Sequence, residues 1–556
     1  MTEPPTNRAS SIGPADDFLR DRRSLLRSLT ESTICLLLAV LLFRTFAAEG
    51  YMISTGSMAP HLLGFHKRVE CPTCHYSFPF GVAYDTDEEG ISAAESDRSR
   101  SHAVCPNCGQ RGINLLQVPR NHGDQLLVYK PAYAFRPPRR WEVVVFRNPH
   151  NPREAYVKRA VGLPGEKIQI IDGDVYADGE LCRKDFATQR LLRVPVYCHQ
   201  HQPEDSSEFR PRWAPVGSPS IGSDGWQAQG FAFQRTTSGD QSWAWVEYAG
   251  WVRYRGHHET VVSPVDWPGD IDPSAIPPAG LRYEPRTRTL RCVGALPETV
   301  RDQLLAHPAD VAFHAAVTKL YEESHVAPIT DDYGYNPHDG SIVPVPIRDV
   351  MVSLQVDSAS GEGEFAIEMT DGSANYTTVF DLRRRSVRMY AADHEEPVAE
   401  DHLPSQFGVR PVTIEMSLFD QQVCVAVDGE QILSPWFYAS PENTPHPRFP
   451  VRFGSQGLNV RVSELMVYRD VYYTGTRSKH AIQSPYQLGE DELFVLGDNS
   501  PVSHDSRRWP DGAVHTSLLV GKPFVVHLPS KPGRLRIGPF ETQLRLPDFE
   551  RMQRLP

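Results

Sequence analysis

The sequence predicts a mostly β protein with one N-terminal transmembrane helix. Proline (48 residues) and glycine (39 residues) are frequent and long helical periodicities are scarce, a pattern typical of short strands joined by turns. An apolar run, ICLLLAVLLF (Ile34 to Phe43), lies near the N-terminus. With 556 residues, the chain is long enough for several domains.

The overall charge excludes one class of partner. The formal net charge is -12, so there is no dominant basic field to neutralise phosphates. We therefore expect no nucleic-acid partner.

The N-terminus predicts the compartment. A basic cluster at Arg20, Arg22, Arg23 and Arg27 precedes the apolar run. The run is short against the about 20 residues that span a bilayer, so the predicted anchor takes in its shoulders and covers residues 29–48, after a polar tail at 1–28. Positive charge before the anchor favours a cytoplasmic N-terminus, with the rest of the chain outside. A cleaved secretory signal is the competing interpretation.

Five segments carry the functional signal, and each joins a β-favouring run to a turn. The segments are MISTGSMAPHLLG (Met52 to Gly64), GDQLLVYK (Gly123 to Lys130), RRWEVVVFRNP (Arg139 to Pro149), AYVKRAVGLPGEKI (Ala155 to Ile168) and FVLGDNSPVSHDSRRW (Phe494 to Trp509). In this order they closely resemble bacterial type I signal peptidase, a membrane-bound Ser/Lys protease. The resemblance implies a β catalytic core of that type at residues 49–70, 114–185 and 473–556, the last of which includes a C-terminal tail.

The chemistry of a Ser/Lys pair can be argued from the residues. A serine hydroxyl is a weak nucleophile and needs an adjacent base. A lysine is a base only when neutral, and burial among apolar groups lowers its pKa from about 10.4. Lys158 lies in a strand-like run that permits such burial, whereas Arg159 would point to the opposite face.

The resemblance assigns the site residues. It implies that Ser57 is the nucleophile, Lys158 the general base, Thr55 a donor to the oxyanion beside the Ser57 N–H, and Ser503 the group that orients the lysine. For Thr55 and Ser503 the alternative is a turn hydroxyl that bonds its own backbone. The family commonly has a charged pair where Ser500-Pro501-Val502 stands here. The expected supporting residues are Gly497, Asp498, Asn499, Asp505 and Arg507.

The resemblance also implies the activity: a serine endopeptidase of the cell (inner) membrane that cleaves signal peptides from exported preproteins with small side chains one and three residues before the cut. Its partners would be these preproteins and membrane lipid, and catalysis would need no cofactor. Two alternatives remain open. One is a catalytically dead scaffold that acts as a membrane-anchored glycan- or protein-binding module; the other is a Ser/Lys protease that trims itself.

Four cysteines predict a structural metal site. CPTC (Cys71 to Cys74) and CPNC (Cys105 to Cys108) have the paired turns of a zinc ribbon, which aim four thiolates at one ion. The predicted insertion covers residues 71–113. Disulfides are the alternative, because exported cysteines can oxidise.

Two further insertions are expected. Residues 186–345 are rich in Trp, Pro and Gly and predict strands and loops. Residues 346–472 alternate apolar and polar positions between turns, and they resemble a concanavalin-like or laminin-G-like jelly-roll sandwich. Such a sandwich binds glycans or proteins in some cases and is a passive spacer in others.

Overall fold

A computed structural model of the protein describes residues 14–82, 101–203, 211–217, 225–237, 242–250, 259–263, 265–269, 280–308, 310–337, 343–392, 394–441, 443–475, 478–527, 529–537 and 540–555. The fold is mostly β, as predicted.

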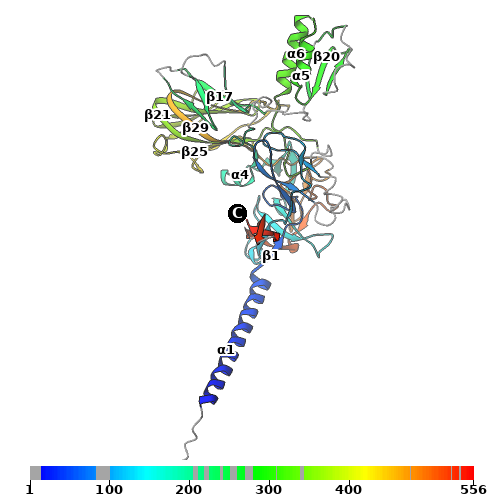
Figure 1. The fold of residues 1–556 in the computed structure, drawn as a ribbon, viewed down its shortest axis with the longest axis vertical. Helices are drawn as coiled ribbons and strands as arrows, with labels where there is room; N and C mark the ends of the chain where they lie inside the picture. The colour runs from blue at the N-terminus through cyan, green and yellow to red at the C-terminus, as the bar shows by residue number, and fades with distance from the viewer. Residues whose placement is uncertain are drawn as a thin grey trace, which may run out of the picture.

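A long N-terminal helix, α1 (Pro14–Leu42), continues into a π-helical turn, η1 (Phe43–Ala47). It projects away from the rest of the molecule (Figure 1). The stretch Arg27–Ala47 is long and apolar enough to cross a membrane and is not buried against the protein. The predicted apolar helix is confirmed, and both an anchor and a signal sequence fit it. Part of the expected polar tail, 1–28, is helical from Pro14 on, and residues 1–13 lie outside the described part.

An antiparallel core sheet collects strands from distant parts of the chain in the order β1-β7-β33-β8-β9-β31-β32, and β36 pairs with β33. Val143 and Val145 of β8 pack into one apolar cluster and Val144 and Phe146 into another, so both faces of this strand are covered. The strands are β1 (Ala48–Met52), β7 (Gln125–Tyr129), β8 (Val143–Arg147), β9 (Ala155–Gly162), β31 (Glu492–Leu496), β32 (Val514–His515), β33 (Leu519–Val526) and β36 (Gln553–Arg554).

A second, four-stranded sheet of order β12-β11-β10-β30 packs against the core sheet. Ile168 and Val175 of this sheet share an apolar cluster with Val161 and Leu496 of the core sheet. Its strands and the remaining short elements are β10 (Lys167–Ile171), β11 (Asp174–Ala177), β12 (Glu180–Leu181), β30 (Tyr486–Gln487), α3 (Ala132–Phe135), η3 (Thr516–Leu518), η4 (Phe549–Arg551) and the hairpin β34 (Ser530–Ile537) with β35 (Phe540–Pro547).

The cysteine-bearing insertion forms two very small sheets between β1 and β7, with orders β3-β2-β6 and β4-β5. Its apolar cluster includes all four cysteines together with Phe78, Phe80 and Leu115. The strands are β2 (His66–Glu70), β3 (Ser77–Gly81), β4 (His102–Ala103), β5 (Ile113–Asn114) and β6 (Arg120–Asn121).

Two long strands, β21 (Val350–Thr370) and β29 (Val451–Arg469), organise the β-sandwich. They pair along most of their length, from Val350 opposite Arg469 to Met369 opposite Val451. On its other edge, β21 pairs first with β25 (Val412–Ser417) and then with β22 (Asn375–Asp381). Register shifts near the middle of β21 separate these two pairings, so one strand contributes to both layers. The further strands are β23 (Ser386–Ala391), β24 (Ala399–His402), β26 (Gln422–Val427), β27 (Glu430–Gln431) and β28 (Trp436–Phe437).

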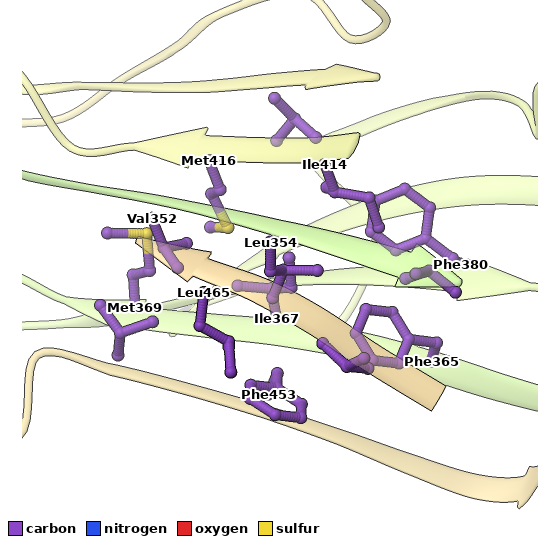
Figure 2. Packing of buried hydrophobic residues seen from close by; sticks show 14 of the residues in the cluster. Val352, Leu354, Phe365, Ile367, Met369, Phe380, Ile414, Met416, Phe453 and Leu465 are labelled. Carbon is purple, nitrogen blue, oxygen red and sulfur yellow. The ribbon is translucent and has the colours of Figure 1, made fainter. Parts of the chain in front are cut away.

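The alternation of apolar residues explains the sandwich core. Val352 and Leu354 point inward at the start of β21, and Phe365, Ile367 and Met369 point inward after the register shifts (Figure 2). The inward-facing residues therefore have even numbers before the register shifts and odd numbers after them. A β-bulge explains this change, because it adds one unpaired residue to the strand.

The same sheet also takes strands from before residue 346. Five strands between residues 194 and 248 belong to it, three of them paired directly with β29. Removing 346–472 alone would therefore leave three of these strands without their partner β29. They are β13 (Val194–Cys198), β14 (Trp213–Pro215), β15 (Trp226–Gln229), β16 (Ala232–Arg235) and β17 (Ala244–Tyr248).

Residues 186–345 also contain helices, where strands and loops were expected. One of them covers a small three-stranded sheet through Phe313, Val317 and Leu320, which have helical spacing, and another adds Val300 and Leu304 to the same apolar cluster. This subdomain stands apart at one end of the molecule (Figure 1). The elements are α4 (Phe186–Leu192), β18 (Glu259–Val262), β19 (Leu281–Glu284), β20 (Thr289–Val293), α5 (Glu298–Leu305) and α6 (Val311–Ser324).

A buried charged cluster joins the four-stranded sheet to the sandwich. The Lys184 ammonium donates to Asp420 and, at 2.7 Å, to Asp470. Carboxylate oxygens of Asp174, Asp349 and Asp420 lie within 4.8 Å of one another. Burial and the neighbouring carboxylates raise the pKa of Asp349 to about 8. One lysine therefore compensates several carboxylates, and part of the cluster holds protons near neutral pH.

Replacing Asp349 with Asn should make stability less dependent on pH. Asp349 has a raised pKa in the folded state, about 8 against an ordinary 3.8, so the folded protein retains a proton that the unfolded chain has lost. The free energy of unfolding should therefore fall as pH rises from about 4 to about 8. Thermal denaturation at several pH values should show a shallower fall for Asp349→Asn than for the wild type. Asp172→Asn, at an exposed aspartate, is the control, and an unchanged slope in Asp349→Asn would contradict the raised pKa.

Candidate functional site

The turn after β1 carries Ser57. The residues that lead into this turn are held by a hydrogen bond from the Ile53 N–H to the Asp124 carbonyl oxygen at 2.9 Å. The turn itself is closed by a hydrogen bond from the Ala59 N–H to the Gly56 carbonyl oxygen at 3.1 Å. Met58 and Ala59 are buried, whereas Ser57 stays partly exposed. The serine is thus held on an anchored turn that begins a few residues after the apolar helix.

Lys158 reaches Ser57 from another strand of the same core sheet. It lies on β9, opposite Val144 of β8, and its side chain is buried. The Lys158 Nζ donates to the Ser57 Oγ at 2.6 Å. Thr55 Oγ1 lies 3.5 Å from the same oxygen. Three of the predicted catalytic side chains therefore meet.

Arg159 points to the opposite face of β9, as strand alternation predicts. Its guanidinium forms a bidentate pair with Asp498, Nε to Oδ1 at 2.8 Å and Nη2 to Oδ2 at 2.6 Å. His61 Nδ1 lies 2.9 Å from Asp498 Oδ2. Burial alone would raise the pKa of Asp498, but Arg159 and His61 hold it well below its usual range. Asp498 is therefore an ionised, buried support.

The loop after β31 binds the back of the Ser57 turn. The Asn499 N–H donates to the Ser57 carbonyl oxygen at 3.0 Å, and the Asn499 Nδ2 donates to the Gly56 carbonyl oxygen at 3.0 Å. A side chain at Gly497 would clash, because a Cβ there would lie 2.3 Å from Ser503 Oγ and 2.5 Å from the Ser57 carbonyl oxygen. Ser503 therefore adjoins the site, and its buried side chain also helps to lower the pKa of Asp505.

Asp505 and Arg507 support this loop from inside. Arg507 pairs with both carboxylate oxygens of Asp505, at 2.9 and 2.8 Å, and Asp505 accepts from the Gly497 N–H at 3.1 Å. Burial alone would raise the pKa of Asp505, but Arg507 lowers it, with a smaller contribution from Lys158. Arg507 also donates to the Ser500 hydroxyl at 2.7 Å. Ser500 is thus bound by the supporting arginine.

The predicted residues therefore gather around one point, but sequence reasoning gave no role to several others. His61 and Arg159 stand inside the quoted motifs, and their adjacency to Pro60 and Lys158 was the available signal. Tyr333 and Asn336 also contact the loop after β31. They lie in the insertion that the motifs do not cover, so nothing in the sequence pattern singled them out.

The four cysteines form a second candidate site. Cys71 Sγ lies 3.6 Å from Cys108 Sγ, and Cys74 Sγ lies 3.6 Å from Cys105 Sγ. The two turns share a hydrogen-bond pattern, since the His75 N–H donates to the Cys71 carbonyl oxygen and the Gly109 N–H to that of Cys105, both at 2.9 Å. All four side chains are buried and unoxidised. This cluster could hold a metal ion.

The core geometry places a serine hydroxyl in hydrogen-bond contact with a buried lysine on a β core, and such a pair could act as a nucleophile and its base. Residues 119–214 and 414–528 match the family model described as Signal peptidase, peptidase S26. Lys158 and Ser503 lie inside the matched residues, and Ser57 precedes them. Over these two segments the chain is therefore similar to the peptidase S26 signal peptidase family.

Curated relatives are similar in sequence to this chain over short stretches. A probable signal peptidase I-1 of Synechocystis sp. is 32% identical over 82 residues, 14% of this chain and 40% of that protein. A signal peptidase I of Leptolyngbya laminosa is 39% identical over 70 residues, 11% of this chain and 34% of that protein. The matches thus span less than half the length of these relatives.

Solved structures resemble another part of the fold. A Bacillus subtilis protein of unknown function with a galectin-like fold matches 22% of this chain and 71% of its own, at 11% identity and a TM-score of 0.18. Sheep galectin-11 matches 22% of this chain and 90% of its own, at 12% identity and a TM-score of 0.17. These likenesses concern fold alone, and the sandwich described above rests on its own strand pairing.

Proposed function

We propose that this chain is a membrane-anchored type I signal peptidase, a serine endopeptidase that removes signal peptides from exported preproteins. The observation that carries the proposal is the 2.6 Å contact between Lys158 Nζ and Ser57 Oγ. The partial match to signal peptidases supports the proposed substrate class.

The proposed mechanism uses the residues around this contact. Neutral Lys158 accepts the proton of Ser57 as the hydroxyl attacks the scissile carbonyl, and then passes that proton to the leaving amine. Thr55 and the Ser57 N–H stabilise the oxyanion. Lys158 then activates the water that hydrolyses the acyl-enzyme. Ser503, which adjoins Gly497 and the Ser57 turn, orients the lysine.

The position of the site suits such a substrate. We propose that α1 is an uncleaved anchor with a cytoplasmic N-terminus, and that everything after it lies outside the membrane. A signal peptide is itself a membrane-inserted apolar segment, so its cleavage point emerges close to the surface. Ser57 follows the anchor by one short strand, β1, and would meet that bond directly.

Two alternatives are less well supported. A catalytically dead scaffold has no need for a serine hydroxyl bonded to a buried lysine. A self-trimming Ser/Lys protease has no need for an apolar helix immediately before its nucleophile. The Lys158–Ser57 contact and the position of α1 therefore both favour the peptidase.

Ser57→Ala and Lys158→Ala should each lower cleavage by more than about 1000-fold, because each removes one member of a nucleophile–base unit. The assay uses purified full-length protein in detergent and a peptide with small side chains one and three residues before the cut. Ser54→Ala and Lys167→Ala, at exposed neighbours of the same residue types, should cleave at the wild-type rate. Turnover that persists in either test variant would refute the mechanism.

We further propose that the cysteine cluster holds a structural zinc ion. Four thiolates about 2.3 Å from a tetrahedral zinc lie about 3.8 Å apart, close to the observed 3.6 Å, whereas a disulfide needs about 2.05 Å. Cys71, Cys74, Cys105 and Cys108 would be the ligands. Zinc would supply stability to the insertion and no catalytic step, since Ser57 and Lys158 need no metal.

Purified protein should therefore contain about one zinc per chain. Changing Cys71 and Cys105 together to Ser should remove it, and Cys182→Ser, outside the cluster, should not. Elemental analysis measures the metal and mass spectrometry any disulfides. Zinc-free protein with disulfides among the four cysteines would overturn the assignment.

A second candidate function is saccharide binding by the sandwich. One face has a hollow of about 410 Å³ that contains Trp243 and Trp245, whose rings stack 5.1 Å apart at 19° and are partly exposed. Its carboxylates are already neutralised, because Glu364 pairs with Arg388 at 2.8 Å and Glu368 with Arg452 at 2.7 Å. The paired ions can donate and accept hydrogen bonds to a ligand without adding net charge, and the indole rings offer the ligand apolar faces. A neutral polyhydroxylated ligand with apolar C–H groups, a saccharide, fits this combination.

On a microarray of neutral oligosaccharides, wild-type protein should bind a subset of sugars. Trp243→Ala and Trp245→Ala should each weaken that binding by at least about tenfold, ~1.4 kcal/mol. Trp267→Ala, in the helical subdomain, should bind as the wild type does. A wild-type protein that binds no sugar, or tryptophan variants that bind equally well, would exclude this function.

A further inference from the structure

The segment Asp331 to Asn336 links the insertion to the Ser57 site. It lies between α6 and β21 and outside the two segments that match the family model. Its side chains nevertheless contact the two loops that build the site. The contacts come from Tyr333, Tyr335 and Asn336.

Asn336 forms a reciprocal amide pair with Asn499. Asn336 Nδ2 donates to Asn499 Oδ1 at 2.8 Å, and Asn499 Nδ2 donates to Asn336 Oδ1 at 2.7 Å. Asn499 Nδ2 also donates to the Gly56 carbonyl oxygen at 3.0 Å, so both of its amide hydrogens are used. Asn336 therefore fixes the orientation of the amide that holds the turn before Ser57.

Tyr333 binds the same loop one residue earlier. Its hydroxyl donates to the Asp498 carbonyl oxygen at 2.7 Å, and its side chain is buried. The carboxylate of Asp498 is meanwhile paired with Arg159. Backbone and side chain of Asp498 are thus held from two different parts of the chain.

Tyr335 fits between the Ser57 turn and the cysteine-bearing insertion. A Cβ at Gly56 or at Gly81 would lie 2.2 Å from the Tyr335 ring, so the ring occupies the space that two glycines leave. Its hydroxyl donates to the Phe65 carbonyl oxygen at 3.1 Å, and its carbonyl oxygen accepts from the Gly81 N–H at 2.8 Å. The ring therefore limits movement of the turn.

The sandwich holds the other side of this segment. Arg469, at the end of β29, donates to the carbonyl oxygens of Asp331 and Asp332 at 3.1 and 3.0 Å, and its guanidinium lies 4.2 Å from the centre of the Tyr333 ring. A cavity of about 870 Å³ borders Tyr333, Tyr335 and Arg469. Tyr333 also packs into the apolar cluster of Val161 and Leu496, so the segment is held by both polar and apolar contacts.

We propose that Asp331 to Asn336 is a positioning element for the nucleophile, contributed by the insertion and held in place by the sandwich. It acts through Asn499 and Gly56 and does not touch the reacting atoms. The insertion would thus set the rate of cleavage although the family motifs lie elsewhere. This inference rests on the proposed peptidase function.

The test measures cleavage by full-length Asn336→Ala, Asn499→Ala and the double variant. A misplaced nucleophile lowers kcat more than it changes KM. We expect Asn336→Ala to lower kcat about tenfold with KM within about twofold, and the double variant to cleave within about twofold of Asn499→Ala, because the two amides act as one unit. Wild-type kcat in Asn336→Ala, or fully additive losses in the double variant, would overturn the proposal.

A tyrosine pair supplies a matched control. Tyr333→Phe removes the hydroxyl that binds the Asp498 carbonyl oxygen, whereas Tyr283→Phe removes one that binds the Val265 carbonyl oxygen at 3.0 Å in the helical subdomain. We expect Tyr333→Phe to have a lower kcat than the wild type and Tyr283→Phe to have the wild-type kcat. Equal losses in both would show a general cost of losing a tyrosine hydroxyl and would overturn the positioning role.

Hydrogen exchange separates this proposal from the peptidase proposal. Amides of the Ser57 turn and of the loop after β31 should exchange faster in Asn336→Ala than in the wild type, whether or not the wild type cleaves peptides. A wild type without cleavage would refute the peptidase function alone. Unchanged exchange in both segments would refute the positioning element alone.

Discussion

The buried pair between Arg159 and Asp498 is the constraint on which the site depends. Arg159 is adjacent to Lys158 on β9, and Asp498 is adjacent to Asn499, which binds the Ser57 turn. One ion pair therefore fixes the strand of the proposed base relative to the loop that holds the proposed nucleophile. Both charged side chains are buried, so each needs the other and its additional hydrogen bonds to offset the cost of burial. His61 and the Trp141 carbonyl oxygen supply such bonds.

The insertions leave this arrangement intact because their ends meet. β13, near the start of the long insertion, and β21 both pair with the final residues of β29, and Val194 and Val350 both lie opposite Arg469. The chain thus leaves the core and returns to it at nearly the same place, as inserted domains require. Arg469 also binds Asp331 and Asp332. The point of return is therefore also the point where the insertion touches the core loops.

Much of the site was predictable from sequence because its residues lie in short motifs with fixed neighbours. Strand alternation was enough to separate Lys158 from Arg159, and matched cysteine turns were enough to predict the buried cluster. The contributions of Tyr333 and Asn336 were not predictable, because they depend on a long-range approach that no local spacing encodes. The sandwich strands before residue 250 were missed for a similar reason: their partner, β29, lies some 200 residues later in the chain. The helices α5 and α6 were obscured by proline- and glycine-rich neighbours.

The position of the site in the chain has a consequence for biosynthesis. Ser57 emerges from the ribosome early, but Lys158, Asn336, Asp498 and Arg507 follow in that order across most of the chain. Domains generally fold as units during synthesis, beginning at the N-terminal end, yet this site joins the first soluble turn to one of the last loops. A growing chain whose helix α1 has already entered the membrane would contain Ser57 but not yet Lys158 or the supporting residues of the site. On the proposed function, proteolytic competence would arise only after residues as far along the chain as Arg507 have followed Ser57 across the membrane.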